Sequence, residues 1–394
     1  MERKASTARS DLEQLLVDET AEPKALPLSL LEDITGDFSA DQEIGRGGFA
    51  VVYKGILGDR AVAVKRLSNA LMDETKFHRE VECLMQVKHK NVVRFLGYCA
   101  DRQGNMERYN GKLVMADVHQ RLLCFEYITK GGLDKYIIGT TMWPLTFIFV
   151  LSFILQNVSS QHTRQIQLYL VKVESINLNW KEYYNKCLCS PFVDTHREWR
   201  MCYTIIIGIC EGLQYLHENH IVHLDLKPAN ILLDNNMIPK ITDFGLSRCF
   251  DENQSQDITK SVLGTIGYMA LELRQGGVIA RSSDLFSLGV IIIEILTGQK
   301  GYQATEDVLE SWSDRLEGSE RDALLEQIRV CYETALECID FNPKKRPPSA
   351  QNIIDRLHLM ESIPIERPDI TLWFCPVDIM FHHSGNEWSA KMFV

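Results

Sequence analysis

The sequence has no apolar run long enough to cross a bilayer, and basic residues are in the minority. Its longest apolar stretch, from Met142 to Leu155, holds about a dozen mostly apolar residues, whereas a membrane-spanning helix needs about 20. Lys and Arg number 42 against 53 Asp and Glu, so the formal net charge is −11. An acidic surface repels phosphate backbones and anionic lipid. We therefore expect no transmembrane span and no nucleic-acid partner.

An apolar secretory signal is also missing, since Met1 to Ser10 is polar and basic. The 11 cysteines are scattered without the spacing of a disulfide framework. Cys187 and Cys189 form the one close pair, but they lack the second pair that structural zinc sites usually need. Such cysteines in a reducing compartment act as small core residues. We expect a cytoplasmic protein, which a partner would bring to the inner face of the plasma membrane if it acts there.

The texture of the sequence changes along the chain. Residues 1–37 are polar and acidic and read as an N-terminal extension, whereas residues 38–128 hold short β-rich runs around one helical stretch. Helical patterns dominate from Cys202 onward. A β-rich part followed by an α-rich part predicts an α+β fold of two lobes, residues 38–128 and residues 129–360. Residues 361–394 follow as a tail.

A glycine-rich stretch from Ile44 to Val52 lies between two strand-like runs. Gly45, Gly47 and Gly48 would let the backbone approach a polyphosphate closely and point N–H groups at it. A flexible hairpin turn would produce the same pattern, so this loop alone does not decide between the two. It is not a Walker motif, because no Gly-Lys-Ser/Thr follows.

Lys65 ends the apolar strand that begins at Val62. A lysine in this position often extends to solvent. Beyond a glycine loop, however, it is placed to reach the α- and β-phosphates of a nucleotide. It then needs an anionic partner, and Glu80 on the following helix is the candidate, with Glu82 as the rival.

Two further motifs follow in order, His223-Leu224-Asp225-Leu226-Lys227-Pro228-Ala229-Asn230 and Lys240-Ile241-Thr242-Asp243-Phe244-Gly245. Together with the loop and Lys65 they resemble a eukaryotic protein kinase, and most of all the cytoplasmic kinase domains of plant receptor-like kinases. The resemblance covers about Phe38 to Met360, apart from an insert. It implies an ATP-dependent kinase of the serine/threonine type, because Asp225-Leu226-Lys227-Pro228-Ala229-Asn230 is similar to that class.

The resemblance also implies roles for these residues. Phosphoryl transfer needs charge neutralised and an alcohol aimed in line. Asp225 would accept the proton of the substrate hydroxyl, and Lys227 would steady the γ-phosphoryl. Asn230 and Asp243 would supply oxygen ligands to Mg²⁺. The substrates would be proteins, this chain included, and an upstream receptor kinase would be a partner.

The nucleotide pocket follows from the same resemblance. Phe125 would lie at its back, and Ile128 would stand at the hinge position whose backbone pairs with adenine. Such pockets hold the ring between apolar side chains. Those expected here are Ile44, Val52, Ala63 and Leu232.

Other positions would shape the large lobe. Thr265 lies in a stretch that resembles the substrate-side loop of serine/threonine kinases. Thr259 and Ser261 would lie in the activation loop, where their hydroxyls could be modified. Asp284 would brace backbone amides of the catalytic loop. Glu272 would pair with Arg346.

The chain departs from the family at several points. Ala50 replaces the third loop glycine, and Leu271 replaces the proline of Ala-Pro-Glu, both small losses. Leu224 replaces the arginine that grips an activation-loop phosphate, so we expect no dependence on that switch.

The segment 139–193 stands where the family has a short loop. We interpret it as translated intron sequence, with a real surface insertion as the alternative, and the fold survives either because loop entropy grows slowly with length. A membrane span there would separate the two lobes across a bilayer, so it is rejected. The rival functions are a pseudokinase scaffold and a splice form that the insert inactivates.

Overall fold

The structure is a computed structural model, which describes residues 2–68, 74–109, 111–137, 195–251, 254, 256–360, 379–384 and 387–392. The chain divides into two compact units, Met1–Met360 and Glu361–Val394. In the second unit, β13 (Ile379–Ser384) and β14 (Glu387–Met392) pair as an antiparallel hairpin. The insert 139–193, with Cys187 and Cys189, lies outside the described residues.

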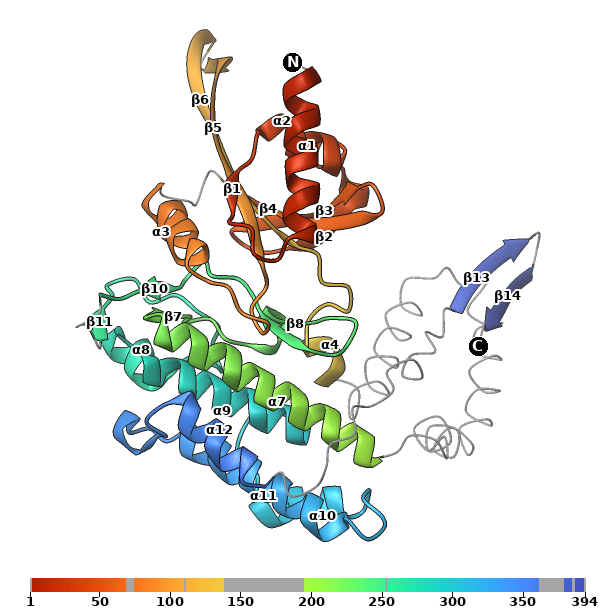
Figure 1. Ribbon diagram of the computed structural model, residues 1–394, viewed down its shortest axis with the longest axis vertical. Helices are drawn as coiled ribbons and strands as arrows, with labels where there is room; N and C mark the ends of the chain where they lie inside the picture. The colour runs from red at the N-terminus through yellow and green to blue at the C-terminus, as the bar shows by residue number, and fades with distance from the viewer. Residues whose placement is uncertain are drawn as a thin grey trace, which may run out of the picture. The chain divides into compact units, whose positions relative to one another are not determined.

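The small lobe is built on one sheet of six strands in the order β1-β5-β6-β4-β3-β2 (Figure 1). β1 lies parallel to β5, and the other neighbours are antiparallel. β5 and β6 are long, 15 residues each, and form a hairpin. The strands are β1 (Lys24–Ala25), β2 (Glu43–Arg46), β3 (Ala50–Leu57), β4 (Arg60–Leu67), β5 (Phe95–Tyr109) and β6 (Lys112–Glu126).

The N-terminal segment is part of this lobe. Its helices α1 (Glu2–Val17) and α2 (Leu28–Thr35) share one apolar cluster with the sheet. Leu12 and Leu15, one helical turn apart, are buried there with Leu31 of α2. β1 adds the first strand of the sheet. Residues 1–37, expected as an extension, therefore contribute core to the small lobe.

The helix α3 (Glu74–Met85) follows β4 and is the helical stretch expected among the β-rich runs of residues 38–128. Phe77 is buried on its inner face and meets the ring of Tyr98 edge-on at 6.4 Å. Arg121 of β6 reaches Glu74 at 3.1 Å, which ties the start of α3 to the sheet. This anchoring decides where the next turn of α3, with Glu80, points.

The large lobe is mostly helical, and α7 and α9 contact each other at its centre (Figure 1). A Cβ on Gly289 of α9 would stand 2.8 Å from the Ala335 carbonyl of α11, so these two helices need glycine at their contact. The helices are α4 (Asp134–Ile137), α7 (Thr195–Glu218), α8 (Leu271–Gly276), α9 (Arg281–Thr297), α10 (Thr305–Ser313), α11 (Arg321–Cys338) and α12 (Ala350–His358).

Short strands and 3-10 turns make up parts of the chain between the larger elements. The turns are η1 (Ala40–Gln42), η3 (Pro228–Asn230) and η4 (Pro343–Lys345). The strands are β7 (Ile221–Val222), β8 (Ile231–Leu233), β9 (Pro239–Ile241), β10 (Arg248–Cys249), β11 (Gln256–Ile258) and β12 (Val278–Ala280). A sheet lobe followed by a helical lobe confirms the predicted two-lobed α+β fold. In the described part of the chain, no helix combines the length and the apolar character needed to cross a membrane.

Candidate active site

Three charged side chains from distant parts of the sequence meet where β4, α3 and the segment after β9 come together. The ammonium of Lys65, on β4, lies 2.7 Å from Glu80 Oε1 and 2.7 Å from Asp243 Oδ1. α3 supplies Glu80, and Asp243 follows β9. The rival partner Glu82 is exposed on the same helix. The structure thus brings together the lysine, the helix glutamate and the carboxylate that the sequence proposes.

Charge sets the protonation of this cluster. The Lys65 ammonium holds the pKa of Asp243 at about 2, against the opposing effect of burial. Burial lowers the pKa of Lys65, but the charges of Asp243 and Glu80 outweigh this effect, so the pKa of Lys65 is raised overall. Burial raises the pKa of Glu80, which Lys65 opposes. Oε2 of Glu80 is buried without a hydrogen-bond partner in the described structure.

A second cluster surrounds Asp225, which is 9% exposed. Lys227 Nζ donates to Asp225 Oδ2 at 2.6 Å, and the Thr265 hydroxyl donates to Oδ1 at 2.7 Å. Lys227 also reaches the Thr265 hydroxyl at 2.9 Å. Asn230 Nδ2 donates to the carbonyl of Asp225 at 2.9 Å and to its carboxylate at 3.1 Å. A base, a cation and an alcohol are therefore within hydrogen-bond distance of one another.

Asp284 of α9 holds the loop that carries Asp225. Its carboxylate is fully buried and accepts the backbone N–H groups of His223 and Leu224, both at 2.8 Å. His217 Nε2 lies 3.0 Å from the same carboxylate. Leu224 has a φ of 68°, a left-handed conformation that side chains rarely adopt. The two amide hydrogen bonds to Asp284 stabilise this turn.

Backbone bonds fix Asn230 and Asp243 relative to each other. The N–H of Thr242 donates to the carbonyl of Asn230 at 2.9 Å. His223 joins both segments, because its Nε2 lies 3.0 Å from the Thr242 carbonyl and the N–H of Asp225 donates to its Nδ1 at 3.3 Å. Asp243 also has a positive φ, of 68°. The two expected metal ligands therefore stand on adjoining segments of the large lobe.

The expected nucleotide pocket lines one face of the small-lobe sheet. Val52 stands opposite Lys65, and Ala63 stands opposite Phe125. Since Ala63 and Lys65 are two residues apart on β4, all four side chains share a face. Val52 and Ala63 are half-buried, and Phe125 is buried.

The remaining pocket residues lie at the edges of this face. Ile44 on β2 is 46% exposed, Ile128 after β6 is buried, and Leu232 of β8 is half-buried. The glycine loop joins β2 and β3, with Gly45 at the end of β2 and the N–H of Gly47 bonded to the Ala50 carbonyl at 2.9 Å. A Cβ on Gly48 would meet no atom within 4 Å, so this turn borders open space.

Glu272 and Arg346 form a buried ion pair away from the two clusters. Arg346 Nη1 and Nη2 donate to the two oxygens of Glu272 at 2.6 and 2.9 Å. The guanidinium also donates to the carbonyls of Ser282 and Asp340. This contact is the one expected from the sequence, and it joins α8 to η4.

Comparison with known proteins agrees with this geometry. The family model "protein tyrosine and serine/threonine kinase" matches residues 38–357. The chain belongs to the protein kinase family.

Relatives of this kinase are plant receptor-like kinases. Cysteine-rich receptor-like protein kinase 27 of Arabidopsis thaliana is 31% identical over 332 residues, 79% of this chain and 41% of the relative. Cysteine-rich receptor-like protein kinase 6 of Oryza sativa subsp. japonica is 30% identical over 389 residues, 93% and 46% of the two chains. A G-type lectin S-receptor-like serine/threonine-protein kinase of Arabidopsis thaliana is 32% identical over 387 residues, 93% and 38% of the two chains.

The family and the relatives indicate which molecules donate and accept the phosphoryl group. The chain spans less than half the length of these curated relatives. Membership of the family implies ATP as the phosphoryl donor and a protein as its acceptor. The names of the relatives agree with the serine/threonine type that the catalytic-loop motif predicts.

Apolar contacts join the loop that carries Asp225 to the segments that follow Asp243. Leu224, in place of the usual arginine, is buried in a cluster with Val222, Phe250, Leu273 and Ile279. Buried apolar area stabilises such a contact without any phosphate. The hydroxyl of Thr259 donates to the Ser261 carbonyl at 3.0 Å, and the Thr259 N–H bonds to Gly277. Thr259 and Ser261 are thus not among the groups that contact Asp225.

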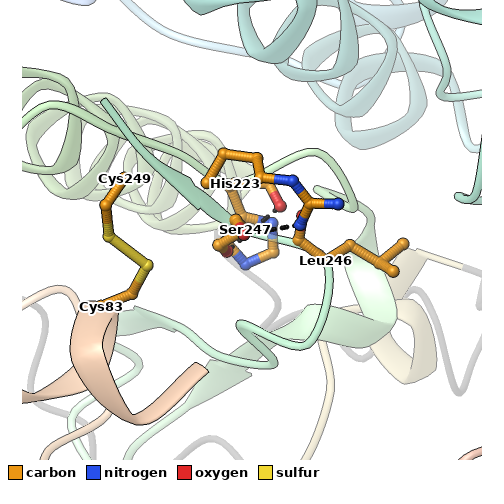
Figure 2. The surroundings of a disulfide bond; sticks show 6 residues. Cys83, His223, Leu246, Ser247 and Cys249 are labelled. Carbon is orange, nitrogen blue, oxygen red and sulfur yellow. Dashed lines mark hydrogen bonds between the residues drawn. A yellow bond between two sulfur atoms is a disulfide. The ribbon is translucent and has the colours of Figure 1, made fainter. Parts of the chain in front are cut away.

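Sequence reasoning missed one link altogether. Cys83 of α3 and Cys249 of β10 are joined by a disulfide, although 166 positions separate them (Figure 2). The expectation that the cysteines act only as small core residues is wrong for this pair. No local spacing could have revealed it, because the fold of both lobes brings the two positions together. Six other cysteines of the described chain are free, namely Cys99, Cys124, Cys202, Cys210, Cys331 and Cys338.

Proposed function

We propose that this chain transfers the γ-phosphoryl of ATP to serine and threonine hydroxyls of proteins, itself included. The observation that carries the proposal is the hydrogen bond from the Thr265 hydroxyl to Asp225 Oδ1, at 2.7 Å. An alcohol already stands where a substrate hydroxyl would have to donate its proton. Lys227 bonds to both the carboxylate and this hydroxyl, so a positive charge lies beside the oxygen that would attack.

Asp225 would act as the acceptor of the substrate proton. A general base must lie within hydrogen-bond reach of the proton that it takes, and the Thr265 contact meets that requirement. A substrate hydroxyl would displace the Thr265 hydroxyl from Oδ1. Asp284 keeps the loop in place during this exchange, through the two backbone N–H groups that it accepts.

Lys65 would bind the α- and β-phosphates, with Glu80 holding its ammonium in place. Burial and the short contact to Glu80 limit the positions open to the lysine. In the structure Lys65 also contacts Asp243, which it would leave for phosphate oxygens. Ile44, Val52, Ala63 and Leu232 would enclose the adenine ring, with Phe125 behind it and the backbone of Ile128 pairing with its edge. The open turn at Gly48 leaves room above for the phosphates.

Asp243 and Asn230 would hold Mg²⁺. Hard oxygen ligands suit this ion, and the low pKa of Asp243 keeps its carboxylate ionised at neutral pH. Both N–H bonds of Asn230 Nδ2 go to Asp225, which directs the amide oxygen to be the ligand. When bound, Mg²⁺ would neutralise the negative charge that develops on the phosphates during transfer.

We also propose an upstream receptor kinase as a partner and the cytoplasm as the site of action. The names of the relatives, which are receptor-like kinases, support the first point. The second follows from the substrate, since ATP is abundant in the cytoplasm. The pseudokinase alternative is disfavoured because Lys65, Glu80, Asp225, Asn230 and Asp243 are all present.

The test is incorporation of labelled phosphate by the purified full chain with Mg²⁺-ATP and a generic acceptor protein. Wild type and the surface control Asp314→Asn should incorporate label at the same rate, and Asp225→Asn should lose it. Acid hydrolysis should release phosphoserine and phosphothreonine. Label that persists in Asp225→Asn, or label on tyrosine alone, would contradict the proposal.

If the wild-type chain is silent, a variant that lacks residues 139–193 decides between the alternatives. Activity after this deletion would mean that the insert disables the enzyme. Silence in both forms, with nucleotide binding retained, would favour the scaffold. Sequencing the transcript addresses the insert itself, since a processed message joining codons near 138 and 194 would support the intron hypothesis.

A further inference from the structure

The disulfide joins two segments that each carry a residue of the active site. Cys83 lies on α3 one helical turn beyond Glu80, and Cys249 lies on β10 in the segment that follows Asp243. Their Cα atoms are 6.1 Å apart, and α3 and β10 contact each other around them. Figure 2 shows the bond bridging the helix and the strand beside Ser247, whose hydroxyl donates to the His223 carbonyl at 3.2 Å.

We propose that Cys83 and Cys249 form a reversible thiol-oxidation site, at which a peroxide closes the disulfide and thereby raises the affinity of this kinase for ATP. The inference rests on the proposed function for its consequence, because Glu80 and Lys65 matter only if the cleft binds nucleotide. The ligand class is a small two-electron oxidant, hydrogen peroxide being the simplest.

The link acts on the part of α3 that positions Glu80. The contact from Arg121 to Glu74 holds the first turn of the helix, and Phe77 packs under the second. Beyond Glu80, the covalent anchor is the bond from Cys83 to Cys249. A cross-link removes conformational freedom from the segments it joins. With the bond closed, the Lys65–Glu80 contact of 2.7 Å is in place.

When the disulfide is reduced, two like charges oppose the packing of α3 against β10. Arg79 lies one helical turn before Cys83, and Arg248 directly precedes Cys249. Burial lowers the pKa of Arg248, and the nearby Arg79 lowers it further, whereas Asp257 acts in the other direction. Part of the Arg248 guanidinium is satisfied by the carbonyls of Leu246 and Ser247, both at 2.9 Å. Repulsion between the two arginines favours separation of α3 from β10 in the reduced chain.

The two cysteines differ from the free cysteines of the described chain because each has a second cysteine next to it, with the Cα atoms 6.1 Å apart. Burial raises the pKa of Cys99 to about 11 and those of Cys124 and Cys202 to about 12, so these remain thiols. Cys249 is half-buried and therefore open to a small oxidant. Cys83 is fully buried beside it and serves as the resolving thiol.

The chemistry balances with one peroxide. The Cys249 thiolate attacks one oxygen of hydrogen peroxide, the O–O bond breaks, and the leaving hydroxide takes up the proton that the thiol had released, so a sulfenic acid and one water result. The Cys83 thiol then attacks the sulfenic sulfur, the S–S bond forms, and the hydroxyl leaves as a second water. Two thiols lose two electrons in all, and the peroxide gains them. A dithiol reverses the step by thiol–disulfide exchange.

The test uses the full chain, reduced with dithiothreitol, desalted, and divided into untreated and peroxide-treated portions. Alkylation of free thiols and peptide mass mapping should find a Cys83–Cys249 peptide, two hydrogens lighter, in the treated portion only. Titration with Mg²⁺-ATP should give an affinity about fivefold or more higher for the oxidised portion. Cys249→Ser should lose the difference, and Cys202→Ser, a matched control on α7, should retain it.

The two proposals fail in different ways. Equal ATP affinity in both portions, absence of the cross-linked peptide, or a peroxide response that persists in Cys249→Ser would each overturn the redox inference. The comparison of the two wild-type portions does not depend on how well any variant folds. A redox-dependent affinity without phosphate incorporation, in the full chain and in the variant that lacks residues 139–193, would leave this inference standing and refute the proposed function. Phosphate incorporation that is identical in both portions, with identical affinity, would do the reverse.

Discussion

Two ion clusters in this kinase are both built from basic and acidic side chains, but they differ in how fully their hydrogen-bonding groups are paired. Arg346 is fully buried, and its donors reach both oxygens of Glu272 and two backbone carbonyls. Lys65 is nearly as buried, but of its two partners Glu80 has an oxygen without a hydrogen bond, and the Asp243 side chain is 42% exposed. Asp243 also has a left-handed backbone.

The difference separates a structural contact from a working one. In the Glu272–Arg346 pair the hydrogen-bonding groups are already used within the protein, so none is available to a ligand. The pair joins α8 to the end of η4. An incomplete cluster keeps hydrogen-bonding capacity that phosphate and metal can use. Strain and unmet polar groups persist at functional sites because the surrounding structure holds them there.

The largest effect is expected from breaking the saturated pair. Arg346→Met would leave the Glu272 carboxylate and two carbonyls buried without their partner, which costs about 3–5 kcal/mol of unfolding free energy. The matched control is Arg356→Met. Arg356 makes the same two-pronged contact to Glu337, but both side chains are exposed, at 38% and 47%. The control should lose no more than about 1 kcal/mol. Urea unfolding measures both, and equal losses would contradict the comparison.

Breaking the incomplete cluster should affect activity more than stability. Lys65→Met removes the cation that would contact the phosphates, and we expect phosphoryl transfer to fall by about 10²–10³-fold. The unfolding free energy should stay within about 1–2 kcal/mol of wild type, because Glu80, whose pKa burial already raises, can take up a proton. Lys90→Met, which removes an exposed ion pair with Glu211, is the control for both assays. A large loss of stability with unchanged activity would reverse our assignment of the two clusters.

The smallest effect is a dependence of stability on acid pH. The pKa of Asp243 is lowered from 3.8 to about 2 in the folded chain. A carboxylate with a lowered pKa contributes stability that is complete above its unfolded pKa and is lost as the pH falls toward its folded pKa. Urea midpoints between about pH 5 and about pH 3 should therefore fall more steeply in wild type than in Asp243→Asn. Parallel curves would mean that the Lys65–Asp243 contact contributes nothing to the folded state.

Much of the candidate site could be predicted because its members occur in short motifs. One short stretch, residues 225–230, contains Asp225, Lys227 and Asn230, so the chain itself keeps them close together. The partner of Lys65 was harder, since Glu80 and Glu82 both lie on α3 and only the rotation of that helix against the sheet separates them. The length of β6 was not predictable from Phe125 and Ile128 alone, because the strand begins at Lys112 and pairs with β5 along its length.

The polar composition of residues 1–37 concealed their place in the small lobe. A few leucines suffice to bury one face of α1 and α2 against the sheet, and β1 is only two residues long. A mean composition does not reveal such a narrow apolar face. The backbone pairing of β1 with β5 depends on a strand far along the chain, which no local pattern contains.

By itself the sequence determined the family, the two-lobed fold and the identity of the charged groups, because these follow from residue types at short, regular spacings. Only the tertiary structure decided which charges are complete and which are left open, that Leu224 packs into an apolar cluster, and that Cys83 meets Cys249. Each of those depends on segments brought together from distant parts of the chain. Burial and distance are properties of that assembly, and they set the hydrogen bonding of these groups and the pKa values of Lys65, Glu80 and Asp243.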